Sequence, residues 1–380
     1  MNTSEAPTET LRVAIVLETS GGGSGRHVLD LTAGLVDRGC SVTVFYATAR
    51  AEEGFVAALH NLPNTVAVEA PMRRSVGAGD VRDLFGLGQL LAKHGPFDIT
   101  HAHSSKAGAL LRLLPRRYAG QRIYTPHAFR TMDPGLSRPL SLLYGGIERV
   151  LGPRADRVIA VSSAEAEHAR SLGLSDRRLR TVVNGVTPGG FAPRAEARSL
   201  MGVDDDAVVI GFIGRLEQQK DPLRFVEAMT IAHQKNAQII GVVAGDGELM
   251  EASRRIAAPE AVKFLGFTAG TSLFEGFDVF AMTSRYEAMP YTLLEALQAG
   301  LPIVSTDVGG VPETVETNKN GYVVPLDASP EEFADVLLPL TGDANRRSAF
   351  AEASRALARE RTADRMVEET LKIYLEAAGH

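Results

Sequence analysis

The chain has 380 residues, of which 44% are hydrophobic and 23% are charged, and its formal net charge is −6. The composition is normal for a globular protein, and the length is more than one ordinary domain needs. The single cysteine, Cys40, excludes an internal disulfide, and no apolar run reaches the roughly 18–20 residues of a membrane span. The polar, acidic start of the chain is neither a signal peptide nor a transit peptide, so we expect a cytoplasmic protein.

Short apolar runs alternate with helical patterns along the whole chain. Near-continuous apolar runs are typical of strands buried on both faces, so the pattern predicts parallel sheets with helical crossovers. The first set of predicted strands is Leu11–Leu17, Val42–Tyr46, Thr65–Val68, Asp98–His103, Arg122–Thr125, Arg157–Val161 and Leu179–Val183. The second set is Val208–Ile213, Ile239–Ala244, Val262–Leu265, Val279–Met282, Ile303–Ser305 and Tyr322–Val324.

A stretch rich in glycine and proline, Asn184–Pro193, separates the two sets and is the best linker. We therefore predict an α/β protein of two doubly wound, Rossmann-like domains, covering residues 1–188 and 189–361. The tail, Glu331–Ala378, is helical by pattern and long enough for three helices. Ligands of such sheets bind outside the carboxyl ends of the strands, so a shared ligand is expected in a cleft between two facing domains.

A glycine-rich loop, Ser20–Gly25, follows the first strand and precedes a helix predicted to begin near Arg26. Glycine lets the backbone approach a ligand closely, and a helix amino terminus offers N–H groups to an anion. The loop is either an ordinary tight turn or a contact for phosphate or sugar. Its spacing does not fit a dinucleotide fingerprint, and no acidic residue closes the strand Val42–Tyr46.

Two cations, Arg215 and Lys220, lie in the connection after the first strand of the second set. Asp221 and Pro222 are predicted to be the N-cap and the first residue of the next helix. The cations then lie at the mouth of a strand–helix connection. A diphosphate needs a cationic clamp of this kind, whereas two basic loop residues are otherwise simply solvated.

The stretch Ser284–Pro302 carries Glu287 in a loop and Glu295 in a helix predicted over Pro290–Ala299. Carboxylates accept hydrogen bonds from hydroxyls, so sugar and ribose are natural partners for the two glutamates. Alternatively, Glu287 only complements the helix dipole and Glu295 is a surface residue. A ligand over the helix amino terminus would meet backbone N–H groups of the segment formed by Met289, Pro290, Tyr291 and Thr292.

This stretch resembles the Glu-x7-Glu signature of glycosyltransferase family four, a family of retaining enzymes with the GT-B fold. The resemblance covers nearly the whole chain. Its further motifs, in family order, are the Gly-Gly loop followed by Arg26-His-Val, Asn184-Gly-Val, Gly214-Arg-Leu with Lys220, Gly245-Asp-Gly-Glu248, Phe264-Leu-Gly-Phe267 and Asp307-Val-Gly-Gly-Val-Pro-Glu313.

The resemblance implies a donor site held by residues of both domains, and a last helix, about 362–380, that packs back on the first domain. The residues expected at the donor diphosphate are Arg215, Lys220, Gly22 and Gly23. Those expected at the sugar, the ribose and the base are Glu287, Glu295, and the backbone of Gly266 and Phe267. Family members are independent of metal, and no Asp-x-Asp motif ends a strand here, so no metal and no cofactor are expected.

His127, in Thr125–Arg130, matches the active-site histidine of the family, although the family often has glycine where Ala128 stands. Thr100–Gly108 looks like the branch that acts on lipid-linked saccharides in surface polysaccharide assembly. The acceptor side is therefore expected at His103, Ser104 and Lys106.

The spacing of His101 and His103 also suggests a metal site, because it puts both rings on one face of a strand. Zinc needs a third ligand, and none is evident nearby. Two other interpretations of His101 and His103 stay open: a pair that packs at the strand end, and a contact with the acceptor.

Charge is spread unevenly, since residues 1–185 carry 22 basic against 17 acidic residues and the rest carry 18 against 29. The basic half attracts anions, including lipid headgroups. Within it, Lys106–Arg117 mixes leucines with arginines, as a helix on an anionic membrane surface does. The alternative is an ordinary crossover helix that packs its leucines on the sheet.

The sequence therefore predicts a retaining glycosyltransferase that moves a hexosyl group from a nucleotide diphosphate sugar to a saccharide acceptor, without nucleic acid. The resemblance favours UDP, with GDP open, a lipid-linked acceptor, and same-face attack in which Glu287 positions the sugar. A soluble acceptor, a nucleotide-sugar epimerase of the same fold and a non-catalytic nucleotide-sugar-binding protein are the alternatives.

Overall fold

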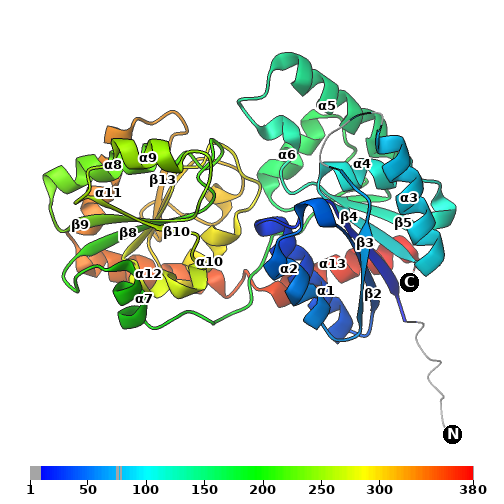
Figure 1. Cartoon of the computed structure of the whole chain (residues 1–380), viewed down its shortest axis with the longest axis horizontal. Coiled ribbons are helices and arrows are strands. Elements are labelled where there is room, and N and C mark those ends of the chain that lie inside the picture. Colours follow the sequence, from blue (N-terminus) through cyan, green and yellow to red (C-terminus); the bar gives the residue numbers. More distant parts are fainter. Residues whose placement is uncertain (1–9, 74–76, 78, 380) are drawn as a thin grey trace, which may run out of the picture. The chain divides into compact units, whose positions relative to one another are not determined.

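The computed structural model describes residues 10–73, 77 and 79–379, which form two compact units (Figure 1). The N-terminal unit comprises the chain up to Thr131, then 136–184, and finally the segment from Ala363 onward. The C-terminal unit comprises 132–135 and 185–362. The division after Asn184 lies at the start of the glycine- and proline-rich stretch that the sequence marks as a linker.

The N-terminal unit is built on a sheet of seven parallel strands in the order β3-β2-β1-β4-β5-β6-β7. Its strands are β1 Arg12–Leu17, β2 Ser41–Ala47, β3 Thr65–Ala70, β4 Ile99–His103, β5 Gln121–Thr125, β6 Arg157–Ala160 and β7 Leu179–Thr181. Its helices are α1 Gly23–Asp37, α2 Glu53–Asn61, α3 Gly79–His94, α4 Ser105–Leu113, α5 Arg138–Leu151, α6 Ser163–Ser171 and α13 Ala363–Ala378.

The last helix, α13, belongs to the core of the N-terminal unit. Its buried side chains, Val367 and Tyr374 among them, pack in one cluster with apolar residues of β1 and α1. Gly34 of α1 lies so close to this helix that a Cβ atom there would be 2.7 Å from the Val367 side chain. The chain thus returns to its first unit after completing the second.

The C-terminal unit is built on a second parallel sheet, of six strands in the order β10-β9-β8-β11-β12-β13. Its strands are β8 Val208–Ile213, β9 Ile239–Ala244, β10 Val262–Gly266, β11 Val279–Met282, β12 Ile303–Thr306 and β13 Gly321–Val324. Its helices are α7 Arg194–Met201, α8 Pro222–Lys235, α9 Met250–Ile256, α10 Tyr291–Ala299, α11 Pro330–Thr341 and α12 Ala344–Ala358.

These two sheets confirm the predicted fold class of two doubly wound, Rossmann-like domains. In each sheet the strand order reverses once, between β1 and β4 and between β8 and β11. Open α/β sheets bind ligands at such reversals, beyond the carboxyl ends of the strands. The topology therefore predicts ligand-binding residues in the loops that follow these four strands.

Of the two interpretations of Lys106–Arg117, the structure supports the crossover helix, because most of this segment forms the largely buried helix α4. Leu110 and Leu111 pack in the core against the sheet. Arg112 is fully buried, and its guanidinium makes a two-pronged ion pair with Glu148 of α5, at 2.7 and 3.2 Å. The Tyr124 ring lies 4.2 Å from this guanidinium.

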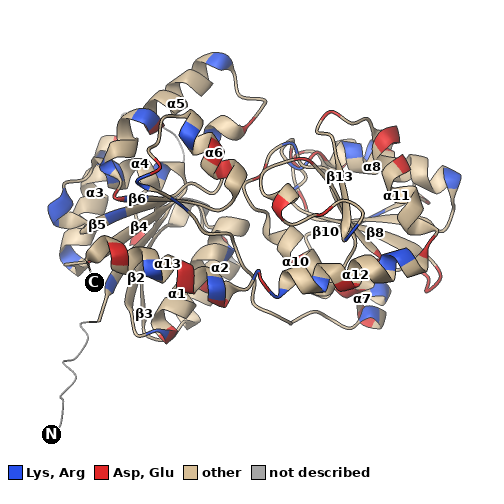
Figure 2. Ribbon diagram, turned by 180° about the vertical axis from the view of Figure 1, so that it is seen from behind, with Lys and Arg blue, Asp and Glu red and all other residues tan. Residues whose placement is uncertain are grey.

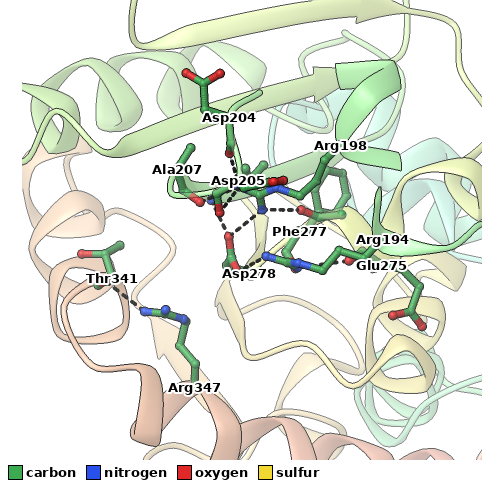
Figure 3. Close-up of polar contacts among 12 residues, drawn as sticks. Arg194, Arg198, Asp204, Asp205, Ala207, Glu275, Phe277, Asp278, Thr341 and Arg347 are labelled. Carbon is green, nitrogen blue, oxygen red and sulfur yellow. Dashed lines mark hydrogen bonds and ion pairs between the residues drawn. The ribbon is translucent and has the colours of Figure 1, made fainter. Parts of the chain in front are cut away.

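A second buried arginine ties α7 to the sheet of the C-terminal unit (Figure 3). Arg198, 3% exposed, donates to the backbone oxygens of Gly276, Asp204 and Ala207. It also pairs with Asp278 at 3.3 Å, and the same carboxylate accepts the Val209 N–H of β8. This network fixes the amino ends of β8 and β11, so it serves the scaffold.

Candidate functional site

The loops after β8 and β11 bring Lys220 and Glu287 together. Lys220 Nζ lies 2.5 Å from Glu287 Oε1, and both side chains are largely buried. The two residues are 67 positions apart in sequence, so only the strand reversal makes them neighbours. The structure thus joins a cation and a carboxylate that the sequence assigns to one ligand.

Backbone and side-chain bonds hold the two loops in register. The Arg285 N–H donates to the Gln219 carbonyl at 2.7 Å, and Gln219 Nε2 donates to the Tyr286 carbonyl at 3.2 Å. The Thr283 hydroxyl donates to the carbonyls of Lys220 and Asp221. These four hydrogen bonds between the loops pre-position Lys220 and Glu287, as electrostatic catalysis requires.

The same loops carry further charged residues. Arg215, on the same loop as Lys220, is half exposed and pairs with Glu217 at 3.1 Å. Asp221 is the N-cap residue of α8 and Pro222 its first residue, as predicted, and the Asp221 side chain makes no capping hydrogen bond. Its carboxylate instead faces Arg224 at 3.2 Å and Arg285 at 3.7 Å, and its backbone has a φ of 47°.

A third loop, after β12, packs against the backbone of Glu287. Gly309 lies so close that a Cβ atom there would be 2.2 Å from the Glu287 carbonyl oxygen, and its φ is +49°. The next residue, Gly310, donates its N–H to the Ala288 carbonyl at 2.7 Å. Only glycine fits this approach, which explains the Gly-Gly pair in the motif Asp307–Glu313.

The helix after Glu287, α10, begins at Tyr291, with Pro290 at its N-cap rather than inside its first turn. Met289 and Tyr291 are buried, and Glu295 lies partly buried along the helix. Gly266 and Phe267 lie at the end of β10, two strands away from β8 in the sheet. The Phe267 side chain is 88% exposed.

In the N-terminal unit, the loop after β1 leads directly into α1. This helix begins at Gly23, three residues before the predicted start, and Gly22 is its N-cap with a φ of 67°. Such a φ favours glycine. Gly22 and Gly23 therefore place the amino terminus of a long helix at the carboxyl end of β1, which is an anion-binding geometry.

Three histidines from β4, the β5 loop and α1 meet at this end of the sheet. His103 Nδ1 lies 3.0 Å from His127 Nε2, and the two rings are stacked. His27 packs its ring against both, and its Nδ1 donates to the Asn184 side chain at 3.0 Å. His101 bonds to Tyr374 and Thr125, and its ring centroid lies 4.0 Å from that of His103.

Burial keeps these imidazoles uncharged at neutral pH. Desolvation lowers the pKa of His27 to about 4, although the Asn184 hydrogen bond acts in the opposite direction. Desolvation, followed by repulsion from neighbouring histidines, also holds the pKa values of His101, His103 and His127 well below the usual value. Neutral rings can both donate and accept hydrogen bonds, as contact with sugar hydroxyls needs.

Three histidines that could hold a metal ion lie together, but the group contains His103 without His101, so it is not the pair that the sequence suggested. Nitrogen atoms of His27, His103 and His127 lie within 4.8 Å of one another, and imidazole suits zinc and other transition metals. The hydrogen bond between His103 and His127 accounts for their approach without an ion. The expectation of a metal-independent site therefore stays a prediction.

The backbone next to these histidines is strained. His127 and Ala128 have φ values of 53° and 77°, and Ser104 has a φ of 78°. Such values cost an L-residue roughly 1–2 kcal/mol each, and they cluster at functional sites. In addition, His103 Nε2 and Ser104 Oγ are buried without a hydrogen-bond partner among the residues that the structure describes.

A buried glutamate of α6 holds the strained turn. Glu165 accepts the Ala128 N–H at 2.6 Å with one oxygen and the Val161 N–H at 2.7 Å with the other. Burial raises the pKa of the Glu165 carboxyl to about 7, although the two N–H groups lower it. Glu165 thus connects the backbone beside His127 to the end of β6.

The remaining acceptor-side candidate, Lys106, is directed toward α3. Its Nζ lies 2.6 Å from Asp80 and 3.7 Å from Asp83. Lys106 is therefore engaged within the unit, next to but distinct from the histidine cluster.

Comparison with known proteins identifies the family. Residues 21–189 match the model described as Glycosyltransferase Family 4, and residues 207–343 match the model described as Glycosyl transferases group 1. The chain belongs to the family 4 glycosyltransferases. The transferase is therefore an enzyme, and the epimerase and binding-protein alternatives are set aside.

Relatives and a solved structure agree with this assignment. The transferase is 28% identical to the UDP-Gal:alpha-D-GlcNAc-diphosphoundecaprenol alpha-1,3-galactosyltransferase of Escherichia coli, over 70% of this chain and 71% of the relative. It is also 28% identical to the D-inositol 3-phosphate glycosyltransferase of Actinosynnema mirum, over 75% and 74%. The structure of Anabaena HepE in complex with UDP and glucose, 21% identical, superposes with a TM-score of 0.80 over 97% of this chain and all of that one.

Several residues at these loops carry no local signal in the sequence. His27 stands only within the motif Arg26-His-Val, and no pattern marks Glu165 or Gln219. Each acts through a partner distant in sequence, and Asn184 is 157 residues from His27.

Among the residues that the structure describes, no helix has both the length and the apolar character that a membrane-spanning segment needs.

Exchanging Ala128 for glycine is expected to raise the free energy of unfolding by about 0.5–1 kcal/mol. The strain at a φ of 77° disappears, and this gain exceeds the added entropy of a glycine in the unfolded chain. Denaturant unfolding measures the change. Ala164→Gly, in the ordinary helical backbone of α6, is the control and should lower the free energy of unfolding instead. If both variants lowered the free energy of unfolding equally, the backbone at Ala128 would not be strained.

Acidification from pH 7 to pH 6 is expected to lower the free energy of unfolding of the N-terminal unit by about 2 kcal/mol. The four histidines have depressed pKa values in the folded state and so take up protons only on unfolding, near pH 6.5. Glu165, whose pKa is raised to about 7, opposes them over part of this window.

Denaturant titrations at pH 7 and pH 6 measure this fall in the free energy of unfolding. In His101→Gln the fall should be smaller by roughly a quarter, whereas the exposed His60→Gln should leave it unchanged. A fall of the same size in His101→Gln would show that the buried histidines are not its source.

Proposed function

We propose that the transferase moves a hexosyl group from a UDP-sugar to a lipid-linked saccharide, with retention at the anomeric carbon. The observation that carries the proposal is the Lys220–Glu287 pair, at 2.5 Å, at the strand reversal of the C-terminal unit. The Escherichia coli relative bears a name that states a UDP-galactose donor and an undecaprenol-linked acceptor. UDP and glucose are named in the HepE complex.

In the proposed reaction the bond between the anomeric carbon and the diphosphate breaks. Negative charge develops on the departing diphosphate, and Lys220 and Arg215 stabilise it as preorganised cations. The amino terminus of α10 adds to this field, because it is the positive end of the helix dipole. Glu287 then accepts hydrogen bonds from sugar hydroxyls, while Glu295 does the same for the ribose.

Glu287 positions the sugar and forms no covalent bond in this scheme. The acceptor hydroxyl attacks from the face that the diphosphate leaves, and the leaving phosphate helps to take its proton. A double displacement would instead need a carboxylate nucleophile. Mass spectrometry of the enzyme trapped with a slow donor distinguishes the two, because a glycosyl adduct on Glu287 would overturn the same-face scheme.

His127 is the candidate of the N-terminal unit for contact with the transferred sugar. Its ring is neutral, and its backbone is held in a strained turn by Glu165. A strained, supported side chain is typical of a group whose orientation matters. His103 and Ser104, with unpartnered polar atoms beside it, are the corresponding candidates for the acceptor.

A thermal-shift series with UDP, GDP and ADP tests the donor. A nucleotide that binds the native state at 100 times its Kd adds about 2.7 kcal/mol of stability. We expect a shift with UDP that is lost in Lys220→Met and kept in Lys235→Met. A shift with GDP alone would overturn the UDP assignment.

Turnover with two acceptor types tests the acceptor. Several relatives are named D-inositol 3-phosphate glycosyltransferases, so a soluble inositol phosphate is the second candidate. The enzyme is assayed with UDP-hexoses and either undecaprenyl-diphosphate-linked N-acetylglucosamine or inositol 3-phosphate. Product only with the inositol phosphate would replace the lipid-linked assignment, and NMR of the new anomeric proton reports retention.

A further inference from the structure

Helix α5 exposes several large apolar side chains to solvent. Leu142 is 78% exposed, Leu143 is 55% exposed and Val150 is 68% exposed. With Pro139 and Gly146, which are also exposed, they recur at the three- and four-residue spacing of one helix face. The buried residues of the helix are Leu151 and Glu148, and Glu148 is bound to Arg112. A surface helix normally places its apolar stripe toward the core, so these exposed side chains are unusual.

The buried ion pair fixes which face of α5 points outward. Glu148 is held by two bonds from Arg112 and by the Tyr124 hydroxyl at 3.3 Å. Rotating the helix to bury its leucines would remove Glu148 from a fully buried arginine, at a cost of several kcal/mol. In Figure 1 this helix lies at the rim of its unit, outside α4 and α6. The exposed leucines are therefore a stable feature of the surface.

The exposed charged side chains of α5 and of the residues directly flanking it, 134–154, are all positive. Every residue from 134 to 154 is described by the structure, and the exposed charged side chains among them are Arg138, Arg149 and Arg154. Blue segments mark both ends of the helix in Figure 2. The acidic residue of this stretch, Glu148, is buried. An apolar face with arginines at its edges is typical of a helix that lies in the headgroup region of an anionic bilayer.

We propose that the outer face of α5, formed by Pro139, Leu142, Leu143, Gly146 and Val150 with flanking arginines, docks on an anionic lipid surface. A second copy of the chain fits less well, because a symmetric contact through this face would set arginine against arginine without an acidic partner. The inference concerns binding alone and holds whichever donor or acceptor the enzyme uses. It would bring the enzyme to the surface where a lipid-linked saccharide resides.

The chain contains no tryptophan, which provides a direct test. Leu142→Trp in the full chain introduces a single indole on the proposed surface. On addition of vesicles of phosphatidylcholine with phosphatidylglycerol at low salt, we expect its emission to shift to the blue. Leu200→Trp, at a residue of α7 that is 55% exposed, is the matched control and should not shift. No shift from position 142, with or without salt, would overturn the proposal.

Vesicle flotation of unlabelled protein separates this surface from others. Leu142→Gln with Leu143→Gln should weaken binding at least tenfold, and removal of either Arg138 or Arg149 should weaken it about fivefold. Phe85→Gln on α3, where the phenyl ring is 68% exposed, should have little effect. If Phe85→Gln weakened vesicle binding and the α5 variants did not, the assignment of α5 to lipid would be overturned. A dimer in ultracentrifugation that Leu142→Gln dissociates would also overturn it.

The α5 variants should turn over a soluble acceptor at the parent rate. This result keeps the test of lipid binding separate from the test of the proposed function.

Discussion

Exchanging Lys220 for methionine is expected to lower kcat/KM by about 10²–10³-fold. The variant removes a cation aimed at the leaving diphosphate, and loss of one such preorganised group costs roughly 3–4 kcal/mol of transition-state stabilisation. It also leaves the carboxylate of Glu287, which is 7% exposed, without its partner at 2.5 Å. Initial rates of nucleotide diphosphate release at saturating acceptor measure the change.

Lys235→Met is the matched control, because this lysine ends α8, the helix that begins two residues after Lys220. Its Nζ pairs with Asp335 between two exposed side chains, and such surface pairs contribute little. Its rate should stay within twofold of the parent enzyme. A folded Lys220→Met enzyme with more than a fifth of the parent kcat/KM would remove the central cation from the scheme.

Exchanging Glu148 for alanine is expected to lower the free energy of unfolding by about 3–5 kcal/mol. Arg112 would then be a fully buried charge that has lost both of its carboxylate bonds. Removal of one partner of a buried pair costs this much because the other is left uncompensated. Denaturant unfolding of the N-terminal unit measures the loss.

The double variant Arg112→Met with Glu148→Leu supplies the control. Replacement of a whole buried pair by apolar residues of similar volume is often neutral or stabilising. We expect the double variant to recover most of the stability that Glu148→Ala loses. If both variants were equally unstable, the loss would come from packing in α5 and not from the stranded charge.

The strands and the donor loops could be predicted from the sequence because their signals are local. Runs such as Val208–Ile213 are apolar throughout, as strands buried on both faces must be. The motif around Glu287 and the basic loop with Lys220 each follow such a run. Since both loops follow parallel strands, the sequence assigns Lys220 and Glu287 to one donor, and the structure places their charged groups 2.5 Å apart.

The sequence left open those features that depend on a partner distant in the chain. Asp221 is the predicted N-cap of α8, but the contact of its carboxylate with Arg285 could not be predicted from the local sequence. Two interpretations of Lys106–Arg117 stayed open because Glu148, the partner of Arg112, lies 36 residues later in the chain. The exposed leucines of α5 follow from the same contact, so no helical pattern within α5 alone could reveal which side faces water.

The return of the chain to its first unit has a consequence during synthesis. The ribosome makes residues 1–184 first, but Val367 and Tyr374 of α13, which cover part of α1, emerge only after all of residues 185–362. At translation rates of roughly 5–20 residues per second, the wait is on the order of ten seconds or more. Throughout that interval the apolar surface of α1 that α13 later covers is accessible to chaperones. Premature termination before α13 would leave this surface exposed permanently.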